Sequence, residues 1–233
     1  MEQVSTAAKN ALAHILGERC TSCGVRPRMR ENKRCGVCDA RLCRKIALKD
    51  KPEVVDARVI KIVESKYADA VMDDVEPEVL EKLRTRESWQ DVFLWGPPGV
   101  GKTYTMAAMI RAYTGQGYDC MRSSWDEFCC QIRSTMSPAS KMTEWDITER
   151  LKSVDMLFID DLGLRSSVES DFVYQTFFLT LNKRQERLFP TIISSNKNLD
   201  RLRESLFDDR IISRLSTALV IEMEGGDRRQ RKE

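Results

Sequence analysis

The chain of 233 residues has a single histidine, His14, and no apolar run that approaches the length of a membrane-spanning helix. With one histidine, an acid/base pair of two histidines is excluded. Residues 1–16 lack the apolar core of a signal peptide, so we expect a cytoplasmic protein with no membrane partner. The formal net charge is only +2, which excludes any argument about partners from overall charge.

Cysteine, by contrast, occurs eight times, and four of these residues form two C-x-x-C pairs. Cys20 pairs with Cys23, and Cys35 pairs with Cys38 after a spacer of eleven residues. Each pair can supply two thiolates from one turn, and four thiolates close a structural Zn²⁺ site without an open position. The pattern predicts a small zinc-binding domain, with unrelated buried cysteines as the alternative. Cys43 is then a bystander or a replacement ligand.

The cysteine-rich region is basic. Between positions 19 and 45, nine lysines and arginines stand against Glu31 and Asp39, a local surplus of +7. Such a surface could hold DNA phosphates or an acidic protein face. The alternative is a solvated surface that partly offsets the charge of the zinc–thiolate centre.

The strongest motif fits the pattern G-x-x-x-x-G-K-T without a mismatch and reads Gly96-Pro97-Pro98-Gly99-Val100-Gly101-Lys102-Thr103. A strand is predicted before it at 91–95 and a helix after it at 103–112. The glycines let successive N–H groups turn towards phosphate oxygens at a helix N-terminus. We expect Lys102 to reach the β- and γ-phosphates, Thr103 to bind Mg²⁺, and Tyr104 to join the nucleotide site. The motif predicts ATP binding, with a chance glycine-rich turn as the alternative.

A pair of carboxylates, Asp160 and Asp161, ends a predicted buried strand that begins at 154. The carboxyl ends of strands are where ligands bind in open α/β sheets. We expect Asp160 to hold Mg²⁺ and Asp161 to polarise the attacking water, with an ordinary loop pair as the alternative. Asn196 ends another predicted strand, 188–196, and is expected near the same edge, where it could orient a water or touch the γ-phosphate.

Two arginines, Arg210 and Arg214, lie one turn apart in a predicted helix over 206–215 and so share a face. An arginine on such a helix can complete a neighbour's active site by offsetting charge on the γ-phosphate. The alternative is a surface helix with salt bridges.

The order of the motifs predicts a fold of class α/β, with a parallel sheet flanked by helices, and a small domain before it. We place a zinc-binding domain at 1–45, a linker at 46–65 and the nucleotide-binding domain at 66–233. The linker is rich in charged and β-branched residues and contains Pro52. A strand at 118–122 and helices at 125–136 and 145–152 are expected in the nucleotide-binding domain.

Taken in order, the motifs resemble Walker A, Walker B, sensor 1 and the arginine-finger box of AAA+ ATPases, at Gly96–Thr103, Leu157–Asp161, Asn196 and Arg210/Arg214. The chain resembles, more narrowly, DnaC/DnaI-type replicative helicase loaders at Asp160–Gly163, Ser194–Asn196, Arg210–Leu215 and Gly226–Arg229. The transposition ATPase IstB shares this pattern. The resemblance covers about residues 66–233; a zinc module before the ATPase is similar to the DnaI branch, whose ligand set includes histidine.

The resemblance implies an AAA+ ATPase that self-associates, binds a hexameric DnaB-like helicase through its N-terminal domain, and binds single-stranded DNA. It implies catalytic roles for Lys102, Asp160, Asp161 and Asn196, with Arg214 acting on a neighbouring protomer. By the same resemblance, Arg228 or Arg229 would be the sensor 2 arginine at the nucleotide, and the DNA-facing loop would hold Arg165, Ser166 and Ser167.

Two departures from the family pattern bear on these implications. Many AAA+ proteins carry glutamate at the position of Asp161, so slow hydrolysis is expected. The aromatic residue that some loaders place in the DNA loop has no clear counterpart, unless Phe172 or Tyr174 serves.

Three functions are therefore compared. The first is an ATP-dependent helicase loader, which the zinc module favours. The second is an IstB-like regulator that binds duplex DNA and a transposase. The third is a P-loop kinase, which would need an arginine-bearing lid that the sequence does not show and would act as a monomer.

Overall fold

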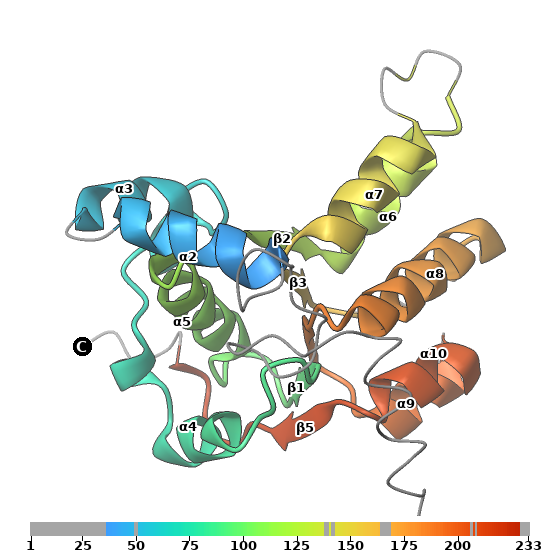
Figure 1. The fold of residues 1–233 in the computed structure, drawn as a ribbon. Coiled ribbons are helices and arrows are strands. Elements are labelled where there is room, and N and C mark those ends of the chain that lie inside the picture. Colours follow the sequence, from blue (N-terminus) through green and yellow to red (C-terminus); the bar gives the residue numbers. More distant parts are fainter. Residues whose placement is uncertain are drawn as a thin grey trace, which may run out of the picture.

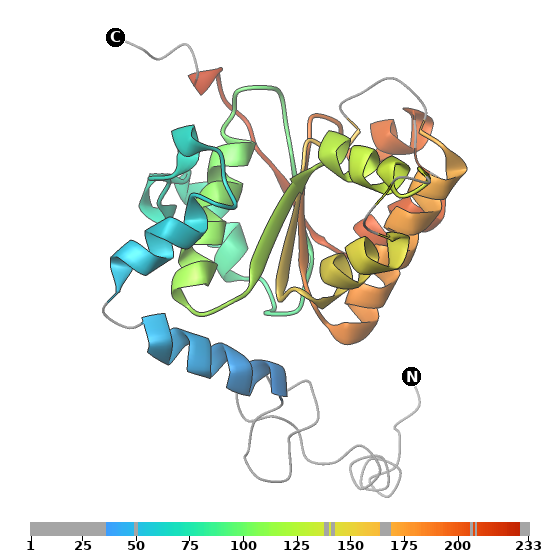
Figure 2. The same ribbon diagram turned by 90° about the horizontal axis from the view of Figure 1, so that it is seen from above.

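The computed structural model describes residues 36–48, 51–137, 140, 143–163, 169–205, 207 and 209–228. Their centre is a five-stranded sheet in the order β2-β3-β4-β1-β5, and every neighbouring pair of strands is parallel. Figure 2 shows helices on both sides of the sheet, which gives three layers. This is the α/β architecture that the motif order predicts.

The strands are short, and the three central ones are almost wholly buried. A strand covered on both faces has a continuous apolar sequence, which is why β1 and β3 are recognisable from the sequence. The bounds are Val92–Trp95 (β1), Cys120–Ser124 (β2), Met156–Asp160 (β3), Thr191–Ser195 (β4) and Leu219–Glu222 (β5).

Along the sequence, the helices precede the first strand and alternate with the later ones. Figure 1 labels them. None of the described helices combines the length and apolar character that crossing a membrane requires. Their bounds are Gly36–Leu48 (α2), Pro52–Val59 (α3), Pro77–Arg84 (α4), Lys102–Gly115 (α5), Trp125–Ser134 (α6), Glu144–Ser153 (α7), Asp171–Arg187 (α8), Leu199–Ser205 (α9) and Asp209–Leu215 (α10), with short 3₁₀ turns at Ser65–Tyr67 (η1) and Met72–Asp74 (η2).

The transition from β2 to α6 is made by one residue, Ser124, which ends the strand and caps the helix. Its hydroxyl accepts from the N–H of Glu127 at 3.2 Å, and the Glu127 carboxylate accepts from the N–H of Ser124 at 2.8 Å. Thr143 and Asp146 form the same reciprocal pair at the start of α7. Such boxes satisfy N–H groups that a helix start leaves unpaired, so they define where both helices begin.

The two faces of the sheet have different cores. Under α3, α4 and α5 the core is aliphatic, with Met106 and Ile110 fully buried. Under the helices from α6 to α10 it is aromatic, and the ring of Trp125 lies 5.1 Å from that of Phe177 and 5.4 Å from that of Phe207. Figure 1 shows the same division, with α8, α9 and α10 together on one side and α3, α4 and α5 on the other.

Arg184, on α8, is fully buried and joins three segments through its guanidinium. It donates to the carbonyl oxygens of Leu151 at 2.7 Å, Val154 at 2.9 Å and Pro190 at 2.7 Å, and to the hydroxyl of Thr191 at 3.1 Å. Burial lowers the pKa of Arg184 to about 10, so it remains charged at neutral pH. The end of α7 and the starts of β3 and β4 are thereby held to α8.

Helix α2 lies against the amino ends of β2 and β3 (Figure 2). The Nε of Arg44 donates to the carbonyl oxygen of Gly117 at 2.7 Å, and its guanidinium forms an ion pair with Asp155. The guanidinium of Arg41 lies 4.4 Å from the ring centre of Tyr118. Because a Cβ at Gly117 would lie 2.5 Å from the carbonyl oxygen of Arg41, the helix can approach only at glycine. Two residues of the basic region therefore hold α2 in place.

The segment expected as a linker, 46–65, is largely helical and packed. It contains α3, whose Val59 is fully buried, and Val63 is almost as buried in the core beside α5. Val55 and Val59 lie one turn apart and face that core. Pro52 occupies the first turn of α3, where a missing N–H costs nothing, so it starts the helix.

Helix α8 contains the two aromatic residues considered for the DNA loop. Tyr174 stacks on Trp125 with ring centres 6.1 Å apart, and its hydroxyl accepts from the N–H of Glu169 at 3.3 Å. Phe172 is half-buried against the same aromatic core. Both side chains therefore serve the core, and neither extends from the loop that follows β3.

Candidate active site

Three segments with predicted roles end at one edge of the sheet, because β1, β4 and β3 are parallel neighbours. β1 leads into Gly96, β3 ends at Asp160, and Asn196 follows β4 directly. Trp95 pairs with Ser195, whose carbonyl oxygen accepts from the N–H of Gly96 at 3.3 Å. The predicted motifs therefore lie side by side at the carboxyl edge, where open α/β sheets bind ligands.

The loop between β1 and α5 requires glycine at two positions. Gly99 has φ +87°, and a Cβ there would lie 2.2 Å from Oδ1 of Asp227. A Cβ at Gly96 would lie 2.1 Å from the carbonyl oxygen of Met223. The loop ends at the first residue of α5, so the N-terminal N–H groups and the positive dipole end of that helix adjoin it. This cradle fits a triphosphate.

Lys102 is the first residue of α5, and its side chain is buried at the loop. Its Nζ donates to the carbonyl oxygens of Gly96 at 2.7 Å and Pro97 at 2.8 Å. The ammonium group is therefore held over the loop by uncharged acceptors. Phosphate oxygens are stronger acceptors for an ammonium group, so these contacts can be exchanged for phosphate contacts.

Asp160 is 1% exposed at the tip of β3 and faces the start of α5. Its Oδ1 lies 3.4 Å from the hydroxyl oxygen of Thr103 and also accepts from the hydroxyl of Ser194. Two oxygens on adjacent positions of an octahedral Mg²⁺ lie about 3 Å apart, and Mg²⁺ prefers hydroxyl and carboxylate oxygens. Thr103 and Asp160 therefore fit the predicted magnesium site in both spacing and chemistry.

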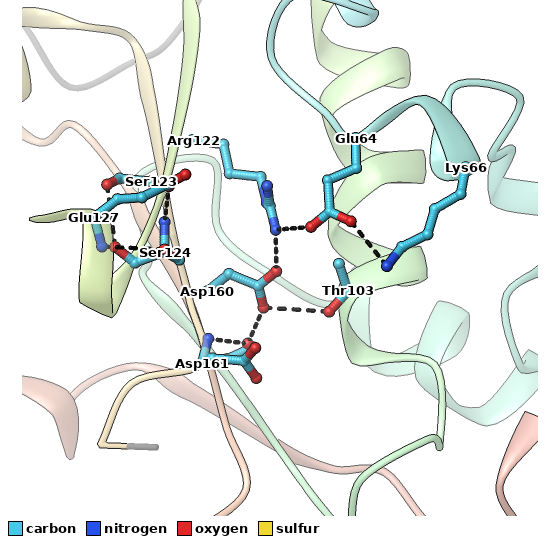
Figure 3. A network of polar contacts seen from close by, with 10 residues as sticks. Glu64, Lys66, Thr103, Arg122, Ser123, Ser124, Glu127, Asp160 and Asp161 are labelled. Carbon is cyan, nitrogen blue, oxygen red and sulfur yellow. Dashed lines mark hydrogen bonds and ion pairs between the residues drawn. The ribbon is translucent and has the colours of Figure 1, made fainter. Parts of the chain in front are cut away.

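Arg122, on β2, contacts the other oxygen of Asp160, a contact that the sequence analysis does not predict. Its Nη2 donates to Oδ2 of Asp160 at 2.6 Å and lies 3.5 Å from Oε1 of Glu64 (Figure 3). Burial acts to lower the pKa of Arg122, but the hydrogen bond and charge of Asp160 outweigh it, so the pKa is raised. A charged residue inside a predicted strand is the only signal of this contact in the sequence.

The chain turns sharply after Asp160. Asp161 has φ +57°, a left-handed conformation that is uncommon for a residue with a side chain. Its N–H donates to the hydroxyl of Ser194 at 2.9 Å, and the N–H of Leu162 donates to the Ser194 carbonyl oxygen at 2.8 Å. Ser194 therefore holds both aspartates, a role that the sequence analysis does not assign. Unusual backbone conformations held by hydrogen bonds cluster at functional sites.

The two arginines of α10 lie over one aromatic ring of α8. The guanidinium carbons of Arg210 and Arg214 are 5.3 and 5.9 Å from the ring centre of Phe178. The Nη2 of Arg214 donates to Oδ1 of Asn182 at 2.7 Å. The shared face that the sequence predicts is confirmed, and it is turned towards α8.

The backbone of Arg214 lies near the amino edge of the sheet, away from its own glycine-rich loop. The side-chain amide of Gln185 donates both to the carbonyl oxygen of Arg214, at 3.2 Å, and to Oδ2 of Asp91, at 2.8 Å. Asp91 directly precedes the four residues of β1, and Gly96 directly follows them. Such a strand is about 13 Å long. The backbone carbonyl of Arg214 is thus separated from its own phosphate loop by about the length of β1.

The last described residues return to the glycine-rich loop. The N–H of Arg228 donates to the carbonyl oxygen of Gly99 at 3.1 Å, and its guanidinium pairs with Glu76. Arg228 therefore lies beside the phosphate-binding loop, whereas Arg229 is outside the described residues. Tyr104 is turned towards segment 67–74, where its hydroxyl donates to Oδ2 of Asp74 at 2.7 Å.

Two predicted sites fall largely outside the described residues. Of the four predicted zinc ligands, only Cys38 is described, and it is buried in the first turn of α2. Cys20, Cys23 and Cys35 lie outside the described part of the chain, as does the predicted DNA-facing loop at 165–167. Within the described part, no three histidine, cysteine or acidic side chains come together as metal ligands.

Comparison with known families identifies the ATPase region. The family model described as "Bacterial DnaA ATPAse domain" matches residues 77–222. The chain is 27% identical over 156 residues to the chromosomal replication initiator protein DnaA of Aquifex aeolicus, covering 65% of this chain and 36% of that protein. It is 29% identical over 136 residues to DnaA of Acinetobacter baylyi, covering 58% of this chain and 28% of that protein. The chain spans about a third of the length of these relatives.

Solved structures show the same fold. AMPPCP-bound DnaA from Aquifex aeolicus is 25% identical, with a TM-score of 0.55 over 65% of this chain and 46% of that one. DnaI is 24% identical, with a TM-score of 0.59 over 71% and 94%. The DnaC helicase loader is 19% identical, with a TM-score of 0.58 over 69% and 99%. The chain therefore belongs to the bacterial DnaA ATPase-domain family and carries an AAA+ ATPase domain related to DNA replication initiation proteins.

Proposed function

We propose that this protein is an ATP-dependent loader of a hexameric, DnaB-like replicative helicase, which it delivers to single-stranded DNA when replication starts. The observation that carries this proposal is the extent of the fold likeness. It covers 71% of this chain for DnaI and 69% for the DnaC helicase loader, with TM-scores of 0.59 and 0.58, against 65% and a TM-score of 0.55 for Aquifex aeolicus DnaA. This is an analogy of fold, so the function has to be tested at the site and with the partner.

ATP hydrolysis in this proposal uses residues from the carboxyl ends of β3 and β4 and from α5. Lys102 would bind the β- and γ-phosphates, and Thr103 and Asp160 would hold Mg²⁺, which supplies positive charge to the phosphate oxygens. Asp161 would accept a proton or a hydrogen bond from the attacking water, and Asn196 would orient that water. Supporting this assignment, all five residues adjoin one edge of the sheet.

Arg214 would complete the active site of a neighbouring protomer, so hydrolysis would require self-association through the ATPase domain. The distance of Arg214 from its own phosphate loop supports a role between protomers. Subunit mixing tests it. Arg214→Ala protomers, which have an intact phosphate loop, should regain ATPase activity when mixed with Lys102→Ala protomers, which still carry Arg214. A mixture as inactive as its components would contradict the assignment.

Residues 1–45 would form a zinc-binding domain with four cysteine ligands, and this domain would bind the helicase. Two C-x-x-C pairs at this spacing support it, and their four thiolates would make the zinc structural. Metal analysis of the purified full-length protein should find one zinc per chain. Cys20→Ser and Cys35→Ser should each lose that zinc, whereas Cys43→Ser, an exposed position on α2, should keep it.

The loader proposal is tested by capture of the replicative helicase from the same cell on the purified full-length protein, in the presence of ATP. We expect capture by the wild-type chain and by Cys43→Ser, and loss of capture with Cys20→Ser. A truncation that starts at residue 51, after α2, should also lose it. Failure of the wild-type chain to bind the helicase would overturn the proposal.

The second candidate is an IstB-like regulator, for which the matching order of ATPase motifs is the specific support. It would bind duplex DNA and a transposase instead of a helicase and single-stranded DNA. ATP-dependent binding to a labelled duplex, compared with the matching single strand, separates the two. Preference for the duplex, without helicase capture, would favour the regulator.

A further inference from the structure

β3 has a buried aspartate at each end, and each is paired with an arginine. Asp155 precedes the strand and pairs with Arg44 of α2, and Asp160 ends the strand and pairs with Arg122 of β2. The first pair is at the amino edge of the sheet, and the second is at the site (Figure 3). Because Asp160 is expected to bind the metal, its pairing with Arg122 has a consequence for the site as well as for the stability of the fold.

The two oxygens of Asp160 have different partners. Oδ2 accepts from Nη2 of Arg122 at 2.6 Å, whereas Oδ1 accepts from the Ser194 hydroxyl and lies 3.4 Å from the Thr103 hydroxyl oxygen. Arg122 therefore contacts the oxygen that faces away from Thr103, so it leaves the metal-facing oxygen accessible. A carboxylate held at both oxygens cannot rotate to exchange them.

Arg122 is itself held from two sides. Its side chain is 11% exposed, and Nη2 also lies 3.5 Å from Oε1 of Glu64, whose other oxygen pairs with Lys66 at 2.8 Å. Glu64 precedes η1, in the segment that leads into the ATPase domain. A planar, permanently charged guanidinium can donate to the carboxylates of Asp160 and Glu64 at once. The ammonium group of a lysine is less well shaped for both contacts.

We propose that Arg122 is a positioning residue of the ATPase site, which fixes the Asp160 carboxylate so that Oδ1 faces Thr103 and can receive the metal of Mg-ATP. The inference rests on the proposed binding of Mg²⁺ by Thr103 and Asp160. Arg122 acts through Asp160, since its guanidinium contacts that carboxylate directly and reaches Glu64 on its other side. Partners that orient a metal-binding side chain commonly change metal affinity or activity by about 10- to 100-fold.

The test separates binding of the nucleotide from binding of its metal. Affinity for a fluorescent, non-hydrolysable ATP analogue is measured in EDTA and over a range of Mg²⁺ concentrations, alongside kcat and KM for ATP. For Arg122→Gln we expect the same nucleotide affinity in EDTA as for the wild type. The Mg²⁺ concentration that gives half of the metal-dependent increase in nucleotide affinity should be roughly tenfold higher or more, and kcat should be roughly tenfold lower or more. Arg122→Lys should recover part of both losses, and Glu64→Gln should show a smaller loss than Arg122→Gln.

Arg44→Gln is the matched control, because it also leaves a buried aspartate of β3 without its arginine, but at the opposite end of the strand. It should lower the melting temperature while leaving the Mg²⁺ dependence unchanged. The inference is overturned if Arg122→Gln has the wild-type Mg²⁺ dependence, or if it loses nucleotide binding in EDTA to the same extent. If Arg122→Gln does not fold, Arg122→Lys decides by the same criteria. A wild-type protein whose nucleotide affinity ignores Mg²⁺ would instead contradict the magnesium site itself.

Discussion

Arg214 of α10 donates a hydrogen bond from Nη2 to Oδ1 of Asn182 on α8, at 2.7 Å. Both residues belong to the same chain, so the guanidinium is held before any neighbouring protomer is present. The Phe178 ring, 5.9 Å from the guanidinium carbon, supports the same orientation. If Arg214 acts on a neighbour, α8 determines the direction in which it is presented.

Asn182→Ala should therefore lower the ATPase activity of the self-associated protein without changing its affinity for ATP. The lost hydrogen bond has one charged partner, and such bonds contribute about 1.5 kcal/mol or more, so a roughly tenfold lower kcat is expected. Steady-state kinetics and ATP titration measure the two quantities. Lys183→Ala, an exposed neighbour on α8, is the control. Equal loss in both variants would show that α8, and not the Asn182 contact, is responsible.

Lys102→Met should abolish nucleotide binding while leaving the fold intact. The Lys102 ammonium group donates to two carbonyl oxygens of the loop. Methionine has a side chain of similar length without the charge, so it can occupy the same space. Loss of a buried, charge-assisted contact to phosphate predicts a decrease in affinity of about 100-fold or more. Fluorescent ATP binding measures it, with circular dichroism to verify folding. An affinity within a few-fold of the wild type would exclude Lys102 from phosphate binding.

Arg184→Met should destabilise the domain strongly, because the carbonyl oxygens of Leu151 and Val154 lose their donor and that of Pro190 keeps only the N–H of Leu157. At about 1 kcal/mol or more for each of the two unsatisfied groups, the expected loss is about 2 kcal/mol or more. Urea unfolding at neutral pH measures it. Arg187→Met, at the end of the same helix, should have a much smaller effect. A stable Arg184→Met variant would mean that these carbonyls find other donors.

Asp91 predicts a dependence of stability on pH. Burial raises its pKa, although the Gln185 amide and the Thr191 N–H donate to it. The folded state thus binds the Asp91 proton more tightly than the unfolded state does, so this contribution to stability is present at low pH. It is lost as pH rises through the folded-state pKa. Asp91→Asn does not titrate, so its free energy of unfolding should rise relative to the wild type as the pH increases from about 4, the ordinary aspartate pKa, through the folded-state pKa.

Urea unfolding of both proteins across that range is the measurement. The wild-type profile also contains other buried acids, such as Asp155, whose pKa burial raises as well. The difference between the two proteins isolates Asp91. A constant or falling difference would contradict the sign of the predicted effect.

The strands and loops that make the phosphate site were predictable because each has a local signature. Strand β3 is a continuous apolar run that ends in Asp160 and Asp161, and a strand buried on both faces must have such a sequence. The glycines of the loop are required by its close contacts with Met223 and Asp227. Parallel neighbours then bring the strand ends together at one edge of the sheet, as the sequence predicts.

The contacts that hold these residues were not predictable, because they depend on polar side chains buried by tertiary structure. Arg122 and Ser194 meet Asp160 only once β2, β3 and β4 are adjacent. Helix α8 was missed for a related reason. Its buried face includes Thr176, Thr180 and Arg184, which a hydrophobic pattern counts as exposed. The sequence thus indicates which groups are candidates for the chemistry, and the fold determines which groups contact them.

The position of α2 has a consequence for turnover. The helix contacts the amino ends of β2 and β3 through Arg44 and Gly117, whereas the phosphate loop lies at the carboxyl edge of the same sheet. A protein that binds α2 would therefore contact the amino edge of the sheet, opposite to the carboxyl edge where ATP would bind and ADP would leave. Nucleotide could then be exchanged while that protein stays attached, which would let one complex pass through repeated cycles without disassembly.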